Sequence, residues 1–566
     1  MSCIGIDLGT TNSLVSVFDG GHARLLPNAL GDFLTPSVVG LADDGETFLV
    51  GKAALNRLIQ HPAITTARFK RLMGTKAKVR LGHRQFDAVQ LSSLVLRALK
   101  ADAEAALGEQ VTDAIISVPA YFNAIQRQAT KDAAETAGLR VRRLINEPTA
   151  AALATGLLDR EAETTFVVLD LGGGTFDVSI LEMFEGVMEV RASSGDARLG
   201  GEDFTRRIAE HFASHLGHDY NRMSPGRQEE FLSLSERVKR GLSGSDAVST
   251  SHELDGRARD FKLDRAEFEE LTSDLLSRMR RPIEGCLYDA NLDVSRLDRV
   301  VLVGGATRMP AVRSLAARIF RQLPVQMIDP DHAVALGAAI QAGLAAGDAA
   351  LGDIVMTDVA PFSLGIESSA KKGQHVVHGL YAPIIERNTP LPASRSRMFT
   401  TLDRNQAVIV VPVYQGEAAT VATNVHLGVI AVPVPPAPAG SEAIDVRFTY
   451  DTSGLLAVDV TVCSTGAKIS EVIDNLAQAL SPAEKAKRLE DMETFKINPR
   501  EEAQNIALIE AINHLHEMLL GSDRAATQQL LVRFEMALES QAPRFIAAER
   551  DAIQHLLDGL ESTLVR

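Results

Sequence analysis

Asp7-Leu8-Gly9-Thr10-Thr11-Asn12-Ser13 lies between two apolar runs, and a near copy of it, Asp170-Leu171-Gly172-Gly173-Gly174-Thr175-Phe176-Asp177, recurs further along the chain. In each copy a β-type run ends in an aspartate, passes through a Gly/Thr turn and resumes as a strand. The paired runs are Cys3 to Ile6 with Leu14 to Phe18, and Phe166 to Leu169 with Val178 to Leu181. Each copy therefore predicts a β-hairpin whose turn has the size of a polyphosphate.

The residue types in these turns suit phosphate binding. Glycine lets the backbone N–H groups approach an anion closely, and the Thr hydroxyls add donors. Asp7 and Asp170, at the strand ends, are placed to hold the water shell of a Mg²⁺ ion. One such turn alone is more typical of an ordinary hairpin, but the repeat favours two turns that hold a nucleotide from both sides. Neither the Gly-x4-Gly-Lys-Ser/Thr motif nor a Gly-x-Gly-x-x-Gly after a strand is present.

Length, composition and charge set limits on the class of protein. The chain has 566 residues, which implies several domains, and 45% hydrophobic with 23% charged residues is typical of a soluble globular protein. A formal net charge of −15 disfavours binding to nucleic acid or to anionic lipid. The three distant cysteines, Cys3, Cys286 and Cys463, favour a reducing cytoplasm over a disulfide framework. We expect neither a signal peptide nor membrane insertion, since no apolar run approaches the roughly 20 residues of a membrane span.

The pattern of elements predicts four parts of the chain. Residues 1–352 alternate strands with helices such as Gln90 to Leu107 and Phe268 to Asp289, and residues 353–358 form a short apolar linker framed by two acids. Residues 359–474 hold short strands such as Val408 to Tyr414 and predict a compact β domain. Residues 475–566 are helical: Ser481-Pro482 has the form of a helix start, and a second helix after Asn498-Pro499 carries an apolar stripe and is closed by Gly521.

Several further strings occur in order along the chain. They are Val118-Pro119-Ala120-Tyr121-Phe122-Asn123, Ile145-Asn146-Glu147-Pro148-Thr149-Ala150, Leu199-Gly200-Gly201-Glu202-Asp203-Phe204, Val303-Gly304-Gly305-Ala306-Thr307-Arg308-Met309-Pro310 and Pro361-Phe362-Ser363-Leu364-Gly365-Ile366-Glu367. With these strings the chain resembles the DnaK-like, seventy-kilodalton heat-shock (Hsp70) chaperone family over nearly its whole length. Its short C-terminal part makes it most similar to the bacterial HscC type.

The resemblance implies a multidomain protein. A two-lobed, actin-like (ribonuclease H-like) α/β ATPase domain would precede a β-sandwich peptide-binding domain and a short helical lid. It implies an ATP-dependent chaperone that uses ATP/ADP and Mg²⁺, with K⁺ as a further candidate ion. ATP binding and hydrolysis in the first domain would control the release and capture of extended apolar segments of unfolded proteins.

The resemblance also assigns roles to the residues around the phosphates. Lys70 matches the catalytic lysine of the family, and Glu147 matches its metal-side glutamate. Asp7, Asp170 and Asp177 would surround Mg²⁺ and the attacking water. The phosphates would be bound by Gly9, Thr10, Thr11, Asn12, Gly172, Gly173, Gly174 and Thr175, with Gly200 and Gly201 beside them. Without the resemblance, the Lys70-Arg71 pair would be more typical of a solvated helix face.

The adenosine would be bound by a helix and a glycine turn. Glu236, Lys239, Arg240 and Ser243 are spaced to share one face of a helix, which alone would also suit a surface ladder of salt bridges. The resemblance favours the nucleotide role, because Gly304, Gly305 and Arg308 supply the facing turn. Asp331 would close this pocket.

The resemblance maps a peptide groove onto the β domain. Its residues are Ile366, Phe399, Leu402, Ile409 and Val411. Alternation places Ile409 and Val411 on the same face of one strand. The same residue types suit an ordinary sheet core, so the sequence alone leaves both interpretations open.

Coupling between the two domains is expected to depend on the linker. ATP binding would dock Ile354 to Met356 as an added strand, with Asp358 at its end, so replacing Ile354 or Val355 by Asp would uncouple peptide release from ATP. Arg143 matches a position that contacts J-domain partners, against the alternative of an exposed arginine without a partner. Thr357 stands where the family usually has leucine, which would weaken docking.

Two further features concern partners and setting. The hairpin tipped by Asp255-Gly256 is short, so we predict fast nucleotide release without a dedicated exchange factor. The chain ends without the acidic tail of eukaryotic cytosolic members, which favours a bacterial cytoplasm.

Three other classes of protein are weighed against the chaperone. An actin-like small-molecule (sugar) kinase shares the Asp-x-Gly-Thr-Thr opening, but it has no obvious use for the β domain and lid. A filament-forming actin relative would need neither linker nor groove. The histidines His211, His215, His218, His375 and His378 could indicate a metal enzyme, but without a His-Glu-x-x-His string we expect them to be solvent-exposed side chains.

Overall fold

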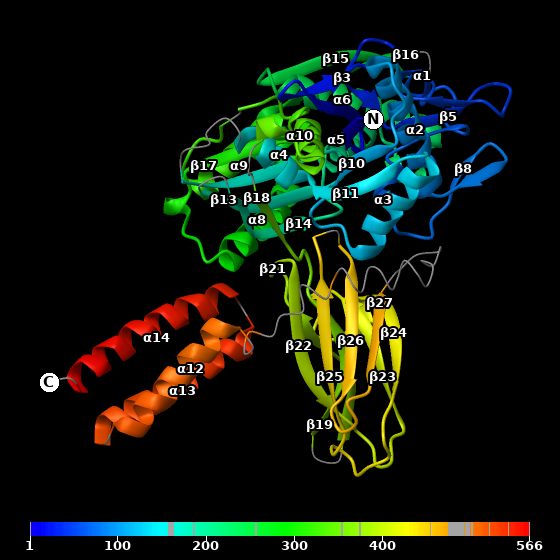
Figure 1. Cartoon of the computed structure of the whole chain (residues 1–566). Helices are drawn as coiled ribbons and strands as arrows, with labels where there is room; N and C mark the ends of the chain where they lie inside the picture. Colours follow the sequence, from blue (N-terminus) through cyan, green and yellow to red (C-terminus); the bar gives the residue numbers. More distant parts are fainter. Residues whose placement is uncertain are drawn as a thin grey trace.

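The computed structural model describes residues 2–156, 163–184, 187–254, 257–325, 327–351, 355–372, 375–452, 454–473, 492, 499, 502–519, 521–541 and 543–564. Figure 1 shows an N-terminal α/β region, a β region below it and a C-terminal helical region to one side. Among the described residues, no helix is both long enough and apolar enough to cross a bilayer.

The N-terminal region contains two sheets built to the same plan. The first has the order β11-β10-β1-β2-β3, with β4 paired to β2. Its strands are β1 Cys3–Asp7, β2 Asn12–Asp19, β3 His22–Leu26, β4 Thr35–Pro36, β10 Asp113–Val118 and β11 Arg140–Asn146. β1, β2 and β3 form an antiparallel meander, and β10 and β11 run parallel to β1.

The second sheet has the order β17-β12-β13-β14-β18-β21. Its strands are β12 Thr164–Leu171, β13 Phe176–Phe184, β14 Val187–Asp196, β17 Arg299–Val303, β18 Val355–Val359 and β21 Pro390–Leu391. β12, β13 and β14 repeat the meander, β17 takes the place of β10, and a parallel bridge from Val301 to Val325 takes the place of β11. The repeated sequence is therefore also a repeated topology, with one Gly/Thr turn in each sheet.

Helices cover both sheets. They are α1 Lys52–Leu55, α2 Ala88–Leu107, α3 Ala124–Thr136, α4 Glu147–Gly156, α5 Gly201–His215, α6 Pro225–Leu242, α7 Arg265–Leu271, α8 Ser273–Asp289, α9 Pro310–Phe320 and α10 Ala333–Ala346. α4 and α10 cross so closely that a Cβ on Gly337 would lie 1.7 Å from the carbonyl oxygen of Ala150. Only glycine permits this crossing, which packs the two sheets around one core.

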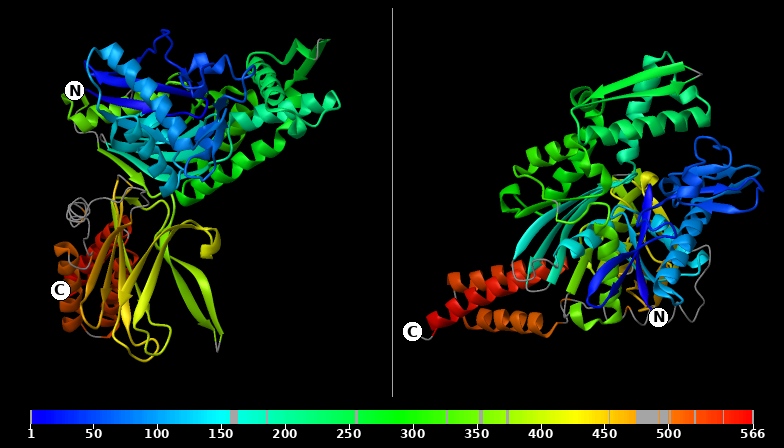
Figure 2. Two further views of the ribbon diagram at one scale, coloured as in Figure 1. Left: turned by 90° about the vertical axis from the view of Figure 1, so that its right-hand side faces the viewer. Right: turned by 90° about the horizontal axis from the view of Figure 1, so that it is seen from above.

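Smaller sheets project from the two lobes. They are β5 Val38–Leu41 with β6 Phe48–Val50 and β7 Thr65–Ala67, β8 Val79–Leu81 with β9 Arg84–Phe86, and β15 Ala247–Leu254 with β16 Arg257–Asp264. In the view from above (Figure 2), the blue segment of β5 to β7 and the green hairpin β15–β16 form separate arms. The tip of that hairpin, Asp255-Gly256, lies outside the described residues.

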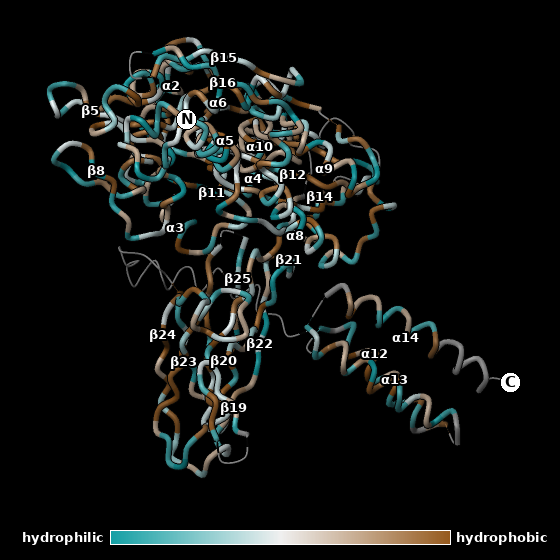
Figure 3. Tube along the Cα trace, turned by 180° about the vertical axis from the view of Figure 1, so that it is seen from behind, coloured by the Kyte–Doolittle hydropathy of each residue, from teal (hydrophilic) through white to brown (hydrophobic). Residues whose placement is uncertain are grey.

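The β region is a sandwich of two four-stranded sheets, with orders β20-β19-β23-β24 and β22-β25-β26-β27. Its strands are β19 Leu364–Lys372, β20 His375–Ile385, β22 Ala393–Thr400, β23 Val408–Gln415, β24 Val425–Pro433, β25 Ala443–Tyr450, β26 Leu456–Val462 and β27 Lys468–Ile473. Alternate residues of both sheets pack into one apolar core. Apolar residues predominate along β23 and β24 in Figure 3.

Three helices follow: α12 Ala503–Met518, α13 Gly521–Ser540 and α14 Pro543–Leu564. The apolar stripe of α12 is buried at Leu508, Ile512 and Leu515, against α13 and α14. The expected helix start at Ser481 and residue Asn498 lie outside the described residues. Gln541, between α13 and α14, accepts a hydrogen bond from the backbone N–H of Ser396 on β22 (3.1 Å).

Candidate functional site

A cavity of about 360 Å³ lies between the two halves of the N-terminal region, within the size range of small-molecule sites. The residues singled out from the sequence that line it are Asp7, Gly9, Thr10, Thr11, Asn12, Lys70, Glu147, Asp170, Gly172, Gly173, Thr175, Gly201, Glu236, Lys239, Arg240, Ser243, Gly304, Gly305, Arg308 and Asp331. Gly174, Asp177 and Gly200 are not among the lining residues. The structure thus gathers side chains from distant parts of the chain around one cavity.

The two Gly/Thr turns face each other across this cavity. A Cβ on Gly173 would lie 2.0 Å from Thr11 Oγ1, and one on Gly174 would lie 2.8 Å from Thr10 Oγ1. Gly200 packs under the second turn, and the N–H of Gly201 donates to the carbonyl of Gly172 (2.9 Å). Gly174 and Gly200 do not line the cavity. Because they have no side chain, Gly174 can approach Thr10 and Gly200 can approach the backbone of the second turn.

One lysine and four carboxylates lie together near the base of the cavity, where all but the half-buried Asp7 are buried. Lys70 Nζ donates to Glu147 Oε1 at 2.8 Å, and both side chains are less than a tenth exposed. Asp7 Oδ1 accepts from Ser117 Oγ (2.8 Å), and Asp177 Oδ1 accepts from the N–H of Tyr121 (3.0 Å). Asp170 and Asp177 are direct cross-strand neighbours on β12 and β13.

The four carboxylates repel one another, and this repulsion favours their protonated forms. Burial, reinforced by Glu147, raises the pKa of Asp7 to about 7 and that of Asp177 to about 8. Burial, together with Glu147 and Asp177, raises the pKa of Asp170 well above its ordinary value. A single lysine does not neutralise these acids, and a divalent cation would favour their ionised forms. The donor set therefore fits a hard metal ion that retains water ligands.

The raised pKa values predict that the nucleotide-free protein loses stability as pH rises. The unfolded chain releases these protons near the ordinary pKa of 3.8, whereas the folded protein keeps them up to about pH 7 for Asp7 and 8 for Asp177. The folded state thus binds more protons between pH 4 and 8, so its stability falls across this window, by at most about 1.4 kcal/mol per pH unit and group. We expect a lower melting temperature at pH 8 than at pH 6 without nucleotide or Mg²⁺.

The matched variant is Asp177→Asn, which keeps the oxygen that accepts from Tyr121 but does not titrate. It should reduce the difference in melting temperature between pH 6 and pH 8. A variant that keeps the full difference would contradict the assignment of this titration to Asp177.

The helix α6 forms one wall of the other end of the cavity. Lys239 is buried, and its Nζ donates to the carbonyl of Gly201 (2.9 Å) and to Thr205 Oγ1 (2.8 Å) on α5. Glu236 forms an ion pair with Lys239 and accepts a hydrogen bond from Arg240 Nε (2.7 Å). This arrangement differs from a surface ladder, because Lys239 connects α6 to the base of the second phosphate turn.

The opposite wall is the turn after β17. Gly304 has φ +80°, and a Cβ there would lie 2.4 Å from the carbonyl oxygen of Leu171, so the position favours glycine. Arg308 donates to Asp329 (2.6 Å) and to Asp331 (2.9 Å), and Asp331 lies beside Gly305. The two walls leave a slot between α6 and this turn.

Comparison with known proteins agrees with this architecture. The model of the family described as Hsp70 protein matches residues 3–80 and 75–561. The chain belongs to the Hsp70 family. The chaperone protein DnaK of Deinococcus deserti is 42% identical over 506 residues, which cover 83% of this chain and 79% of that relative.

Membership in the Hsp70 family establishes the general activity. The protein is an ATPase and an ATP-dependent chaperone that binds ATP and ADP with a divalent metal. It binds unfolded polypeptides and acts with J-domain cochaperones. Nothing in these comparisons favours the alternative of a sugar kinase.

The strand β18 connects the ATPase region to the β sandwich of this Hsp70. Val355, Met356 and Thr357 pair in parallel with β14, and Asp358 and Val359 pair with β21. Ile354, expected to take part in docking, lies outside the described residues. Met356 packs against the core that α4 and α10 share with the second sheet.

A buried polar network holds the end of β18. Asp358 Oδ2 accepts from Asn146 Nδ2 (2.8 Å), and Asn146 Oδ1 accepts from Arg127 (2.5 Å). Burial raises the pKa of Asp358, while the charges of Arg127 and Arg143 oppose this rise. Arg143 is half-buried rather than fully exposed, and its Nε has no hydrogen-bond partner in the described part of the chain.

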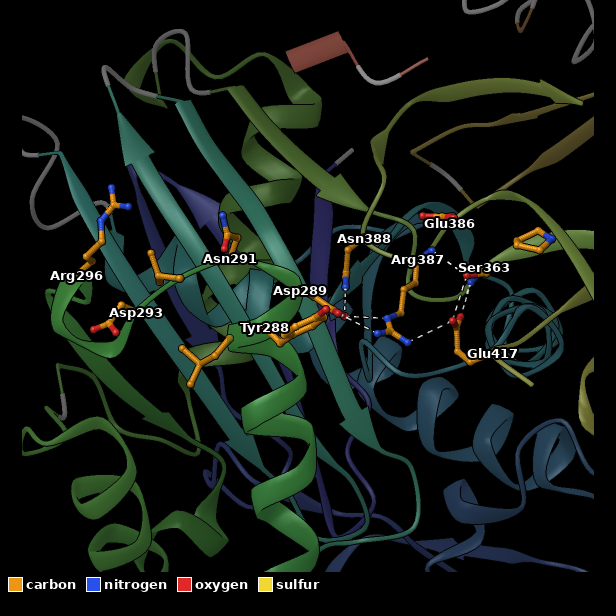
Figure 4. A pocket seen from close by; sticks show the side chains of 13 residues that line it. Tyr288, Asp289, Asn291, Asp293, Arg296, Ser363, Glu386, Arg387, Asn388 and Glu417 are labelled. Carbon is orange, nitrogen blue, oxygen red and sulfur yellow. Dashed lines mark hydrogen bonds and ion pairs between the residues drawn. The ribbon is translucent and has the colours of Figure 1, made fainter. Parts of the chain in front are cut away.

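A second cavity, of about 1030 Å³, lies where the end of α8 meets the β sandwich (Figure 4). Arg387 points to Asp289, with Nε and Nη2 donating to its two carboxylate oxygens at 2.8 and 2.9 Å. Asn388 Nδ2 donates to the same carboxylate (2.8 Å), and Arg387 also contacts Glu417 (3.3 Å). The polar groups of the two regions thus meet directly in this structure.

The five residues mapped to the peptide groove differ in how deeply they are buried in the β sandwich. Ile366 and Val411 are buried in its core, and Phe399 and Ile409 are half-buried against that core. Leu402 is half-buried after the end of β22. Four of the five residues thus lie in or against the core, and their role in peptide binding stays a prediction.

The sequence did not single out several residues of the site. Leu14, Glu202, Ala306, Met309, Pro330 and Val334 also line the nucleotide-sized cavity. Ser117 donates to Asp7, and the N–H of Tyr121 donates to Asp177. The ammonium group of Lys70 lies 5.6 Å from the centre of the Phe122 ring. Tyr121 and Phe122 lie in a string used for the family resemblance, which was the one available signal.

Proposed function

We propose that the cavity binds Mg²⁺-ATP between the two Gly/Thr turns, with the adenosine in the slot between α6 and the Gly304-Gly305 turn. Gly9, Thr10, Thr11 and Asn12 would bind the phosphates from one side, and Gly172, Gly173 and Thr175 from the other. Mg²⁺, held through water by Asp7 and Asp170, would neutralise phosphate charge. The supporting observation is the close approach of the two turns above a buried acidic group.

In this proposal the buried residues divide the chemistry of hydrolysis. The Lys70 ammonium would stabilise charge on the transferred phosphoryl group, while Glu147 fixes the orientation of Lys70. Asp177 would act from beneath the cavity, because it does not line it. Thr175, at the mouth of the second turn, would help to place the attacking water. K⁺ is a further ion that we propose for the same phosphate region.

We propose domain limits at 1–352, 353–358, 359–474 and 475–566, with the last part serving as a short lid. Peptide would bind extended along Ile366, Phe399, Leu402, Ile409 and Val411, through its backbone and one apolar pocket. The half-buried positions Phe399, Leu402 and Ile409 are the members of this set that retain exposure for a ligand.

Coupling is proposed to depend on docking of β18. In the docked strand, backbone hydrogen bonds join Val355 to Thr357 to the ATPase sheet, and Asp358 joins the Asn146 network. ATP would favour this docked arrangement and peptide release, and hydrolysis would favour the undocked one. Arg143, close to Asp358, would transmit contact with a J-domain partner.

The test is the rate at which a labelled apolar peptide leaves the full-length protein, with and without Mg²⁺-ATP. A label is needed because the chain contains no tryptophan. Acceleration by ATP that is lost on replacing Val355 by Asp supports the proposal. A Val355→Asp variant that releases peptide as fast as wild type would refute the linker model, and ATP consumption without peptide binding would refute the groove.

Thr357 supplies a separate prediction. Its Oγ1 is buried in the docked strand and has no hydrogen-bond partner within the described ranges. Thr357→Val removes this hydroxyl at nearly constant volume, so we expect docking to strengthen by about 1–3 kcal/mol. Slower hydrogen exchange at the amides of Val355 to Thr357 would report it. Exposed Thr423 is the matched position, and Thr423→Val should leave the exchange unchanged.

The setting and the remaining partners are also proposals. We propose a bacterial cytoplasmic chaperone of the HscC type, with a narrow set of clients. The hairpin β15–β16 leaves only residues 255 and 256 to connect its last pair, Leu254 and Arg257, and this supports nucleotide release without a dedicated exchange factor. Nucleotide off-rates that rise steeply when such a factor is added would reject this part.

A further inference from the structure

Two histidines and a glutamate meet on the surface of the second lobe, away from the nucleotide-sized cavity. His211 and His215 are one turn apart on α5, and Glu267 lies in the first turn of α7. One donor atom from each residue lies within 4.8 Å of the others. None of the three lines the nucleotide-sized cavity.

The helices that carry these residues are fixed by the core. Phe204, Ile208 and Phe212 repeat along the buried face of α5, and Phe268 is the buried residue of α7. The rings of Phe204 and Phe268 lie 6.2 Å apart, so the core itself sets the distance between the two helices. The donor atoms are therefore brought together by packing and do not depend on flexible loops.

A local hydrogen bond leaves one ring nitrogen of His215 available. His215 Nδ1 lies 3.0 Å from the backbone carbonyl oxygen of His211. A carbonyl only accepts, so Nδ1 carries the proton and the lone pair is on Nε2. Such a bond from a ligand histidine to a backbone carbonyl is the usual support of a metal site.

One of the three donor-atom distances matches the spacing around a small tetrahedral ion. Bonds of about 2.0–2.1 Å to Zn²⁺ place neighbouring ligand atoms roughly 3.3 Å apart in a tetrahedron. His211 Nε2 and Glu267 Oε1 are 3.2 Å apart. The rings of His211 and His215 have centroids 4.2 Å apart, an unfavourable distance if both were protonated.

We propose that His211, His215 and Glu267 form a Zn²⁺ site, with water as the fourth ligand, that joins α5 to α7. Two imidazoles and one carboxylate are a donor set that Zn²⁺ prefers over Mg²⁺. The sequence predicts solvent-exposed histidines, and in the structure His215 is exposed while His211 is half-buried. Sequence spacing could not reveal the site, because Glu267 comes from another helix, and His218 is not part of the cluster.

The experiment is competition for Zn²⁺ between the full-length protein and a chromophoric chelator, without nucleotide. All proteins carry Cys463→Ser, because this exposed thiol is free to bind zinc. The parent protein, Cys463→Ser with an intact site, should bind one Zn²⁺ ion at least about tenfold more tightly than the variants that also carry His215→Gln or Glu267→Gln. Zn²⁺ should also raise the melting temperature of the protein, and this rise should be smaller in both variants.

His218→Gln is the matched control, since it removes an exposed histidine just beyond the same helix. It should bind Zn²⁺ like the parent protein. Equal Zn²⁺ affinity in the parent and in both site variants would overturn the proposal, as would an equal loss in His218→Gln. His211 is less exposed (17%) than Glu267 (44%), so the decision rests on the variants at the more exposed positions 215 and 267.

Discussion

Replacing Lys70 by methionine is expected to slow ATP hydrolysis by about 10²- to 10³-fold, the loss typical of removing one electrostatic donor to a transition state. Lys70 is 5% exposed, and its ammonium group donates to Glu147 at 2.8 Å. Its positive charge opposes the rise in the pKa values of Asp7, Asp170 and Asp177. Its removal takes the positive charge from the place where we propose that phosphoryl charge develops.

The same substitution leaves Glu147 buried and unpaired, which costs about 3–5 kcal/mol of stability in typical buried pairs. A loss of activity in Lys70→Met could therefore reflect unfolding. The double variant Lys70→Met with Glu147→Gln removes both charges, so it should recover melting temperature but not turnover. Single-turnover hydrolysis measures the chemical step directly. Turnover within a few-fold of wild type in a folded Lys70 variant would contradict the catalytic role, and exposed Lys52 gives the control variant Lys52→Met.

Replacing Asp358 by alanine is expected to abolish most of the acceleration of peptide release by ATP. Asp358 accepts from Asn146 and from the N–H of Val359, both at 2.8 Å, and its side chain is buried in the docked arrangement. Hydrogen bonds to charged groups contribute about 1.5–3 kcal/mol, so the docked population should fall roughly 10- to 150-fold. Peptide affinity without nucleotide should change little, because Asp358 is remote from the proposed groove residues.

A double-mutant cycle separates this network from a general loss of stability. Asn146→Ala breaks the same hydrogen bond, so Asp358→Ala should add little to it if the two residues act together. Asp403→Ala, which removes an exposed acid of the β region, is the matched control and should keep the full response to ATP. Full additivity of Asp358→Ala and Asn146→Ala, or normal ATP-driven release in either variant, would contradict the network.

Much of the nucleotide-sized cavity was predictable because its residues come in local strings. In a Gly/Thr turn after an aspartate, a few neighbouring residues determine both the conformation and the donors, so both turns could be located without tertiary information. Lys70 and Glu147 are different. Each is an ordinary residue in its own segment, and only the fold brings them to 2.8 Å from each other. Their assignment from sequence depended on the family resemblance.

The ends of the helices show the same difference between what local sequence predicts and what the fold decides. The helix expected from Phe268 to Asp289 is two helices in the structure, α7 and α8, which meet at Thr272. Gly521, expected to close the helix after Asn498-Pro499, instead begins α13, while α12 begins at Ala503. Local propensity indicated helix correctly, but the direction of each helix follows from the core into which it packs.

The sequence by itself determined the duplicated hairpins, the chemistry of their turns, the order of α/β, β and helical parts, and the family. These properties depend on residues that are neighbours along the chain, where backbone geometry and periodicity are local. Tertiary structure alone decided the charge balance around Asp7, Asp170 and Asp177, the unpaired hydroxyl of Thr357 and the meeting of Glu267 with His211. The shifts in pKa and the burial of a hydroxyl without a partner depend on burial and on contacts between distant residues. Such burial and contacts arise only when the chain folds.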